Sequence, residues 1–140
     1  MNDLFNLIKL GSNPDNEDCQ QVHESLKLAY HIINSSTDAI IICEAEPIHE
    51  PGPRIVYVNE TFVKDTGYSA EEVIGKTPLP LRSKLHDAEF YKAIWDGVKN
   101  NGAWKGEIYS MRKNGDVFPG ILSITAVKDS NNVITNYVTT

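Results

Sequence analysis

The side chains that could perform nucleophilic or acid–base chemistry are few and widely separated in this 140-residue chain. An enzyme of these classes needs a nucleophile with a base in reach, or paired carboxylates in a cleft. Cys43 stands in an apolar run, where a thiol is expected to be buried and inert. The acidic residues that come closest to pairing are better explained as helix caps or solvated groups: Glu44, Glu46, Glu71, Glu72 and Asp87. Because no P-loop, GxGxxG or HExxH pattern occurs, we predict no catalytic residues and no enzymatic activity.

Metal-ligating side chains are equally dispersed. Cys19 and Cys43 lie far apart without a CxxC spacing, which argues against a zinc site or a disulfide framework. His23, His31 and His49 fall on a predicted helix and in a proline-rich loop, from which convergence on one metal ion is not expected. The sequence therefore predicts no metal site and two reduced cysteines.

Composition and charge limit the partners of the chain. The net charge is -6, and the 13 basic residues are scattered, so the sequence lacks the basic patch that binds nucleic acid or anionic lipid. No apolar run approaches the roughly 20 residues of a membrane-spanning helix, and residues 1–11 do not resemble a secretory signal. With 41% hydrophobic and 23% charged residues, the chain should fold. We expect a cytoplasmic protein without nucleic-acid or membrane contacts.

The N-terminal segment is predicted to be an amphipathic helix. Asp15 or Asn16 can cap it, and the acidic residues that follow suit its positive end. Apolar residues recur at steps of three and four, which places them on one seam. Packing on its own domain and pairing with a second chain both remain open, since either buries the stripe. We therefore divide the chain into a helical dimerisation or capping segment, residues 1–34, and a folded domain, residues 35–140, with these dimer-seam candidates: Val22, Leu26, Ala29 and Ile33.

The middle of the chain alternates short strands and helices. Residues 39–43 and 55–58 are β-branched runs typical of strands, and the prolines between them predict a loop over 44–54. Asn59 and Ser69 are placed to cap short helices that end at glycines, with Glu72 completing a capping box after Ser69. Asp87 caps the longest helix, from 88 to about 100, which has one apolar face.

The last third is predicted to be antiparallel sheet, with strands at 104–112, 117–128 and 133–140. A two-residue loop at Asn114 and Gly115 would set Ile108 against Ile121 and Trp104 against Thr125. Apolar residues would then lie on both faces of the sheet. Either a bulge or longer turn shifts the register, or the outer face is also covered. The whole order predicts an α+β fold: a five-stranded antiparallel sheet with helices between its second and third strands, and a cavity between sheet and helices.

Several segments at matching spacing resemble the signature of PAS domains. They are 58–62 (VNETF), 66–69 (TGYS), 72–76 (EVIGK), 86–95 (HDAEFYKAIW), 104–107 (WKGE), 112–115 (RKNG) and 123–128 (SITAVK). The resemblance covers roughly residues 35–140. It implies a sheet flanked by helices that senses a ligand, a cofactor, light or redox state, or that only dimerises. It also implies a position upstream of an output domain, such as a histidine kinase or a diguanylate cyclase.

The resemblance also raises the question of a cofactor. Light-sensing members form a flavin adduct through a cysteine, but the matching segment, residues 75–81 (GKTPLPL), contains none. Haem-binding members need an axial ligand on the long helix, which lacks histidine; His86 just before it is expected to be a surface or cap residue. Trp95 and Trp104 could stack on a non-covalent flavin, but large aromatics usually pack the core, and we favour that interpretation. We predict no cofactor.

These observations together predict a non-catalytic sensory module. We expect it to be a homodimer that binds a small ligand and relays its state to an output domain beyond Thr140, in two-component or cyclic di-GMP signalling. Ligand occupancy would favour one packing of the sheet over another. The alternatives are a constitutive docking or dimerisation module without ligand, and a flavin-binding redox sensor. The candidates for a ligand pocket are Phe62, Tyr68, Trp95, Trp104, Leu122 and Ile124.

Overall fold

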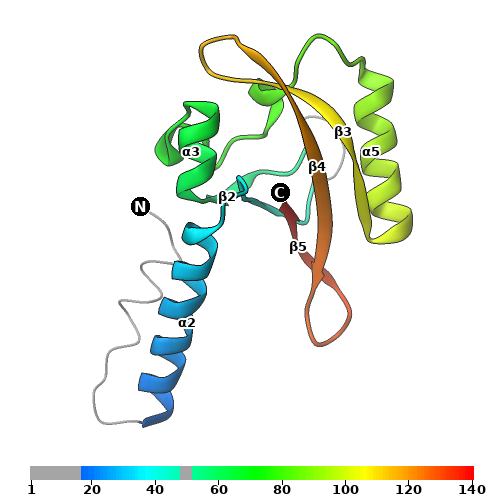
Figure 1. Cartoon of the computed structure of the whole chain (residues 1–140). Coiled ribbons are helices and arrows are strands. Elements are labelled where there is room, and N and C mark those ends of the chain that lie inside the picture. Colours follow the sequence, from blue (N-terminus) through cyan, green and yellow to red (C-terminus); the bar gives the residue numbers. More distant parts are fainter. Residues whose placement is uncertain (1–16, 48–51) are drawn as a thin grey trace. The chain divides into compact units, whose positions relative to one another are not determined.

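The computed structural model describes residues 17–47 and 52–140 (Figure 1). The expected caps Asp15 and Asn16, the histidine His49 and the tip of the proline-rich loop lie outside these residues, as does the side chain of Cys19. The chain forms two compact units that meet between Thr37 and Asp38.

The first unit contains the expected N-terminal helix, α2, over Glu17–Ser35. Of the four seam candidates, Val22 and Ala29 are exposed, while Leu26 and Ile33 are half-buried. Leu28 and Ile32 also expose about three fifths of their surface, 62% and 60%. Large apolar side chains therefore face outward from this helix.

The second unit is built on one antiparallel sheet, and the predicted α+β fold is confirmed. Its strands follow the order β2-β1-β5-β4-β3, so the last strand of the chain lies at the centre. The strands are β1 (Ile41–Glu44), β2 (Ile55–Val58), β3 (Ala103–Met111), β4 (Val117–Lys128) and β5 (Ile134–Thr139). The helices between β2 and β3 are α3 (Glu60–Thr66), α4 (Ala70–Val73), the 3-10 turn η1 (Leu79–Leu81) and α5 (Ala88–Asn101). In Figure 1, α5 runs along the β3–β4 hairpin.

The caps predicted at Asn59, Ser69 and Asp87 are confirmed. The Asn59 side chain accepts the N–H of Phe62, and the Asp87 carboxylate accepts the N–H of Phe90 at 2.8 Å. Ser69 and Glu72 exchange the two bonds of a capping box. Gly67 and Gly102 end α3 and α5 in the left-handed conformation, which glycine adopts without steric cost. The element boundaries differ from expectation by one or two residues; β1, for example, begins at Ile41 rather than Ala39.

The expected two-residue loop in the β3–β4 hairpin is wrong. Arg112 and Asp116 close a three-residue loop, with Arg112 donating to the Asp116 carbonyl and Gly115 at φ +92°. The extra loop residue shifts the register by one, so that Trp104 pairs with Ile124 rather than Thr125. Of the two explanations offered for apolar residues on both faces, the longer turn is the one observed.

Two clusters of apolar side chains make up the core of this unit. One joins α5 to strands β3, β4 and β5, with these buried members: Tyr91, Ile94, Val98, Ile108, Ile124 and Tyr137. The other joins α3 and α4 to β1 and β2, with these: Ile41, Cys43, Ile55, Val58, Phe62 and Val73. We call them the α5 cluster and the α3 cluster.

A buried amide fixes the start of the α3 cluster. The Asn59 side chain, 1% exposed, accepts the N–H of Ile40 at 2.9 Å and donates to the Asp38 carbonyl at 2.9 Å, besides capping α3. The Asn59 backbone N–H donates to the Ile40 carbonyl. One side chain therefore ties the segment that enters β1 to the β2–α3 corner.

Replacing this amide should cost far more than replacing an exposed cap. We expect Asn59→Ala to lower the free energy of unfolding by about 2 to 4 kcal/mol, because it removes a cap and the two part-buried hydrogen bonds to the backbone of Asp38 and Ile40. Asp87→Ala, the matched control, removes an exposed cap and should cost about 1 kcal/mol. Urea unfolding of both variants measures the difference; equal losses would contradict the clamp assigned to Asn59.

Candidate functional site

The six predicted pocket residues do not form one group. Phe62 belongs to the α3 cluster, and Tyr68 packs against that cluster. The other four, Trp95, Trp104, Leu122 and Ile124, belong to or pack against the α5 cluster. The interior between α5 and the sheet therefore holds most of the candidates, and we take it as the candidate site.

Trp104 occupies this interior beside two glycines. A Cβ atom built on Gly97 of α5 would lie 2.8 Å from Cδ1 of Trp104, and one built on Gly106 of β3 would lie 2.7 Å from Cη2. Either distance is shorter than two carbon atoms tolerate. The five-membered ring therefore lies against α5 and the six-membered ring against β3, in a slot that exists because both positions lack a side chain.

The pairing of β3 with β4 extends this site along the sheet. Trp104 pairs with Ile124, Gly106 with Leu122, and Ile108 with Gly120. Paired residues share a face, so these three rows follow one another on the inner face. A Cβ built on Gly120 would meet no atom within 4 Å. Open space therefore remains on the inner face two rows beyond the indole.

Aromatic rings and a histidine close the neighbouring edge of the site. The His86 ring stacks on Phe90 with 3.8 Å between ring centroids, and Phe90 meets Trp104 edge-on at 6.5 Å. His86 Nε2 accepts the backbone N–H of Tyr109 at 2.9 Å, which requires that nitrogen to be unprotonated. Because β3 is an edge strand, this bond covers part of its free edge.

Tyr91 is the buried titratable group at this end of the site. Burial raises the pKa of its hydroxyl, and the neighbouring Ser83 and Arg82 oppose that shift. The Arg82 guanidinium lies 4.3 Å from the centre of the Tyr91 ring. The His86 ring meets the Tyr91 ring edge-on, with 6.0 Å between centroids. Burial keeps the phenol protonated at neutral pH, which suits a structural or hydrogen-bonding role.

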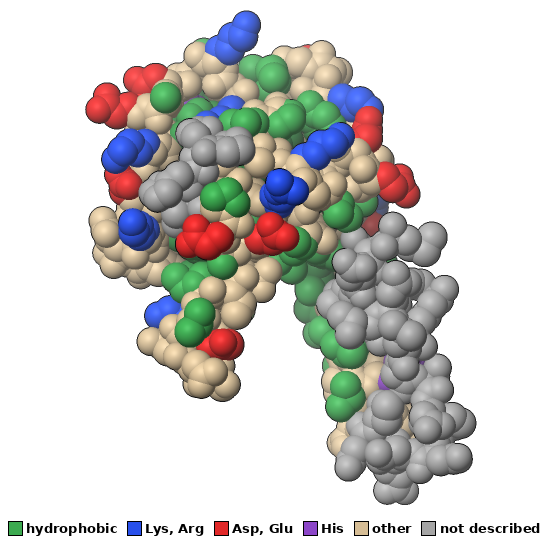
Figure 2. All heavy atoms as spheres, turned by 180° about the vertical axis from the view of Figure 1, so that it is seen from behind, with side chains coloured by type: hydrophobic (Ala, Val, Ile, Leu, Met, Phe, Trp, Pro, Cys, Tyr) green, Lys and Arg blue, Asp and Glu red, His purple; other side chains and the backbone are tan. Residues whose placement is uncertain are grey.

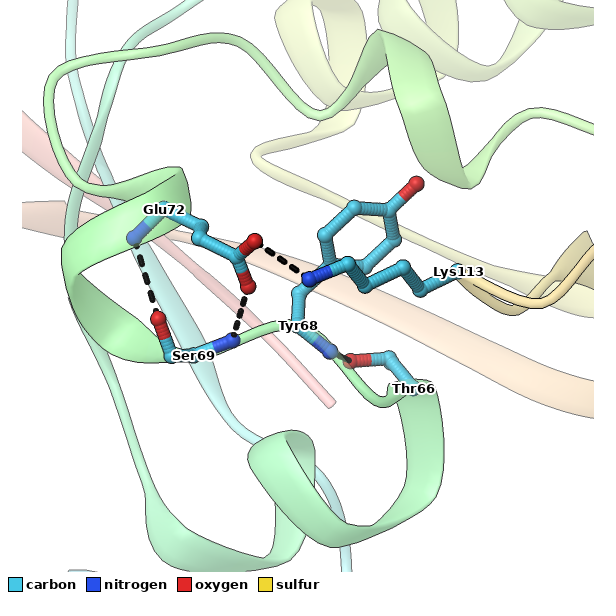
Figure 3. A network of polar contacts seen from close by, with 5 residues as sticks. All are labelled: Thr66, Tyr68, Ser69, Glu72 and Lys113. Carbon is cyan, nitrogen blue, oxygen red and sulfur yellow. Dashed lines mark hydrogen bonds and ion pairs between the residues drawn. The ribbon is translucent and has the colours of Figure 1, made fainter.

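A polar strap joins the β3–β4 hairpin to the α3–α4 corner, as Figure 3 shows. The Lys113 ammonium pairs with the Glu72 carboxylate, and the Lys113 backbone N–H donates to the Thr66 carbonyl at 2.8 Å. Glu72 also accepts the Ser69 N–H at 2.8 Å. The Thr66 hydroxyl accepts the N–H of Tyr68 at 3.3 Å. The two Lys113 bonds connect the loop of the β3–β4 hairpin to the corner between α3 and α4.

The only cysteine whose side chain the structure describes is Cys43, and it is unsuited to chemistry. It is 3% exposed in the α3 cluster, and burial raises the pKa of its thiol to about 12. A thiol of this kind stays protonated at neutral pH and is a poor nucleophile. Among the described residues, His, Cys, Asp and Glu side chains form no group of three that could hold a metal ion.

A flavin is the group that the resemblance to light-sensing domains brings into question. The described cysteine lies on β1 rather than in the segment that follows Gly75, and it is not a thiolate. The residues present therefore do not fit a cysteinyl adduct. A flat ring held without a covalent bond would need the space that the Trp104 indole takes between Gly97 and Gly106.

The outer face of the sheet exposes apolar side chains, at 41% to 58% of their surface: Tyr109, Val117, Ile121 and Val127. On the face seen in Figure 2, Lys and Arg side chains are mixed with Asp and Glu side chains rather than gathered by sign. None of the helices in the described part of the chain is both long and apolar enough to cross a membrane.

Sequence reasoning named Trp104 but missed the glycines that make room for it. The available signal was the Trp-x-Gly spacing of 104 and 106, because residues two apart on a strand lie on the same face. Gly97 in the middle of a predicted helix was a second signal, since glycine is unfavourable there without a packing reason.

Comparison with known proteins gives the family. A family model described as "PAS domain" matches residues 37–140. Phototropin-2 of Oryza sativa subsp. japonica is 29% identical over 84% of this chain and 12% of its own length. Blue-light-activated histidine kinase 1 of Erythrobacter litoralis is 30% identical over 56% of this chain and 22% of its own. The chain thus spans less than a quarter of either relative. A solved PAS domain of a Colwellia psychrerythraea protein superposes with a TM-score of 0.71 at 21% identity, covering 82% of this chain and 92% of that one.

The two inner-face glycines should respond oppositely to a methyl group. Gly106→Ala places a Cβ against the indole, so we expect a loss of about 1 to 3 kcal/mol and a red shift of tryptophan fluorescence as the ring moves. Gly120→Ala, the matched control, meets nothing and should be neutral or stabilising by up to about 1 kcal/mol. Thermal unfolding and emission spectra of the two variants test this prediction. Equal effects of the two substitutions would contradict the close contact between Gly106 and the Trp104 indole.

The strap should make stability depend on pH through Glu72. The Lys113 hydrogen bond, followed by the Ser69 N–H, lowers the pKa of Glu72 below its ordinary 4.5. A carboxylate with a lowered pKa stabilises the fold above its unfolded pKa and loses that effect as the pH falls through the folded value. We expect the stability difference between wild type and Glu72→Gln to be full above about pH 5 and to shrink below it. Parallel pH curves, or the same trend in the neighbouring control Glu71→Gln, would exclude this role.

Proposed function

We propose that this chain, which belongs to the PAS domain family, is a non-catalytic sensory module that takes a small ligand between α5 and the sheet. The observation that carries the proposal is the inner face over β3 and β4, where a slot for one flat ring is followed by open space at Gly120. Apolar residues of the α5 cluster line most of this interior, and the Arg82 guanidinium lies over the Tyr91 ring at its edge. A largely apolar ligand suits such a lining.

The sheet supplies a route by which occupancy could be relayed. One row of paired residues crosses all five strands from the slot: Trp104, Ile124, Thr139, Ile41 and Val58. A ligand that repacks the α5 cluster would act on this row at Trp104, and the central strand β5 would pass the change to β1. The shift requires a ligand with different affinities for the two packings.

We place the module within a longer signalling protein, upstream of an output domain. Support comes from the blue-light-activated histidine kinase, of which the matched segment is only 22%. A histidine kinase or a diguanylate cyclase or phosphodiesterase would be the recipient, and the signalling would be of the two-component or cyclic di-GMP type. We also propose dimerisation through Val22, Leu26, Ala29 and Ile33 of α2, of which Val22 and Ala29 are exposed.

A constitutive docking or dimerisation module is the second candidate. It is favoured by the apolar outer face of the sheet, where Ile121 is 58% exposed, Tyr109 lies in the next row of the hairpin and Val117 in the row after that. Burying such a patch against another surface would stabilise an assembly without any ligand.

Native purification followed by denaturing extraction and mass spectrometry separates the two candidates. We expect a co-purifying small molecule whose removal lowers the Tm by several degrees. Gly120→Leu, which fills the open inner space, should fold and lose the molecule, whereas the surface control Lys105→Ala should keep it.

An empty extract, together with a Tm that added planar heteroaromatic compounds leave unchanged, would overturn the sensory proposal. Sedimentation of the same sample then tests the docking module, which requires a stable assembly in the absence of ligand.

A further inference from the structure

The chain contains two Asn-Gly pairs, at 101–102 and 114–115. In such a pair the glycine nitrogen can attack the side-chain carbonyl carbon of the asparagine, because the glycine has no side chain to hinder the approach. The two pairs have different surroundings. Asn101 is the last residue of α5, whereas Asn114 lies in the loop between β3 and β4.

The first pair is held at both sides of its glycine. The Gly102 N–H donates to the Val98 carbonyl at 2.8 Å, and the Gly102 carbonyl accepts the N–H of Ala126 in β4 at 2.9 Å. Bringing the Gly102 nitrogen to the Asn101 side chain would break the end of α5 and its link to the sheet. Both the helix and the sheet therefore oppose the attack at this pair.

The second pair lies in an exposed loop. Asn114, Gly115 and Asp116 are all exposed, and the Gly115 N–H donates to the Arg112 carbonyl of the same loop at 2.9 Å. Breaking that bond opens one turn and leaves the pairing of the strands in place. Exposed turn bonds of this kind open at a small cost in free energy. The Gly115 nitrogen is therefore the more easily released of the two.

The Asn114 carboxamide is polarised by the residue two positions on. Its Oδ1 accepts the Asp116 backbone N–H at 3.0 Å. Attack at Cγ places negative charge on this oxygen, and a hydrogen-bond donor already directed at it stabilises that charge. The loop therefore supplies both the nucleophile and a donor for the charge that develops.

We propose that Asn114 is a site of spontaneous deamidation and isoaspartate formation in the folded protein, and that Asn101 is protected. The Gly115 nitrogen loses its proton and bonds to Cγ of Asn114, the Cγ–Nδ2 bond breaks, and Nδ2 leaves with that proton as ammonia. Water then opens the five-membered succinimide ring, and the ring nitrogen regains a proton. Opening at Cγ yields aspartate, whereas opening at the main-chain carbonyl yields isoaspartate.

The products would loosen the strap that joins the hairpin to the α3–α4 corner. Asn114 Nδ2 donates to the Asp116 carboxylate at 2.8 Å, whereas the new acid would place a second negative charge there. Isoaspartate also adds one carbon to the loop backbone beside Lys113, whose N–H donates to the Thr66 carbonyl. We therefore expect the modified chain to unfold at a lower temperature than the unmodified chain.

Peptide mapping by mass spectrometry, after incubation of the full 140-residue chain at mildly alkaline pH, tests the proposal. We expect acid to replace amide at least tenfold faster at residue 114 than at residue 101. The matched control is the same chain unfolded in urea, where both Asn-Gly pairs lose their structure and should react at similar rates. Equal rates in the folded chain, a faster reaction at residue 101, or no reaction at residue 114 once the unfolded chain has reacted would overturn the proposal.

Thermal unfolding of the incubated samples tests the effect on the strap. We expect the incubated wild type to lose several degrees of Tm. Asn114→Gln, whose longer side chain closes a ring far more slowly, should keep its Tm over the same incubation. An unchanged Tm of the modified wild type, or an equal loss by Asn114→Gln, would contradict the loosening assigned to this loop.

Discussion

The sheet-containing unit depends on the pairing of its last strand with two others. β5 lies between β1 and β4, so neither half of the sheet is joined to the other until residues 134–139 are in place. On β5, Tyr137 of the α5 cluster pairs with Cys43 of β1, which belongs to the α3 cluster. Both residues are 3% exposed. The two cores therefore share a boundary at β5. Pairing between elements so distant in sequence has a large loop-closure cost, which the burial of both clusters has to offset.

The polar contacts reinforce this division into two cores. Asn59 secures the α3 cluster by binding the segment before β1, at Asp38 and Ile40. The strap from Lys113 to Thr66 and Glu72 crosses from the β3–β4 hairpin to the α3–α4 corner. The exposed ion pair contributes little by itself. Its backbone bond, however, fixes where the hairpin loop meets the helices, and the loop sets the register of the strands that carry Trp104. A one-residue change in that loop would move every inner-face side chain of one strand to the outer face.

Much of this architecture could be predicted from local sequence rules. Asn59, Ser69 and Asp87 act as caps because their side chains can satisfy helix N–H groups, and this property does not depend on the rest of the fold. The loop at Asn114 and Gly115 was predicted with the wrong length, because that dipeptide suits both a two-residue turn and a type I turn followed by a left-handed glycine. Which one forms is decided by the register that buries Ile108 and Ile124 together, which is a tertiary effect. The separation of Phe62 and Tyr68 from the other pocket candidates was likewise invisible, since residue type does not reveal which of two cores a side chain joins.

A row of paired residues and one hydrogen bond connect the slot around Trp104 to Asp38, the first residue of the second unit. The row from Trp104 ends at Val58, and the next residue, Asn59, binds the carbonyl of Asp38, where the second unit begins. Spatial continuity alone does not establish coupling. The row becomes a signalling route only if Trp104 has two positions whose populations a ligand changes. Moving such an equilibrium from 1:99 to 99:1 takes a differential affinity of about 10⁴-fold. A well-packed unliganded state raises this requirement, because the ligand must also offset the packing that it disrupts.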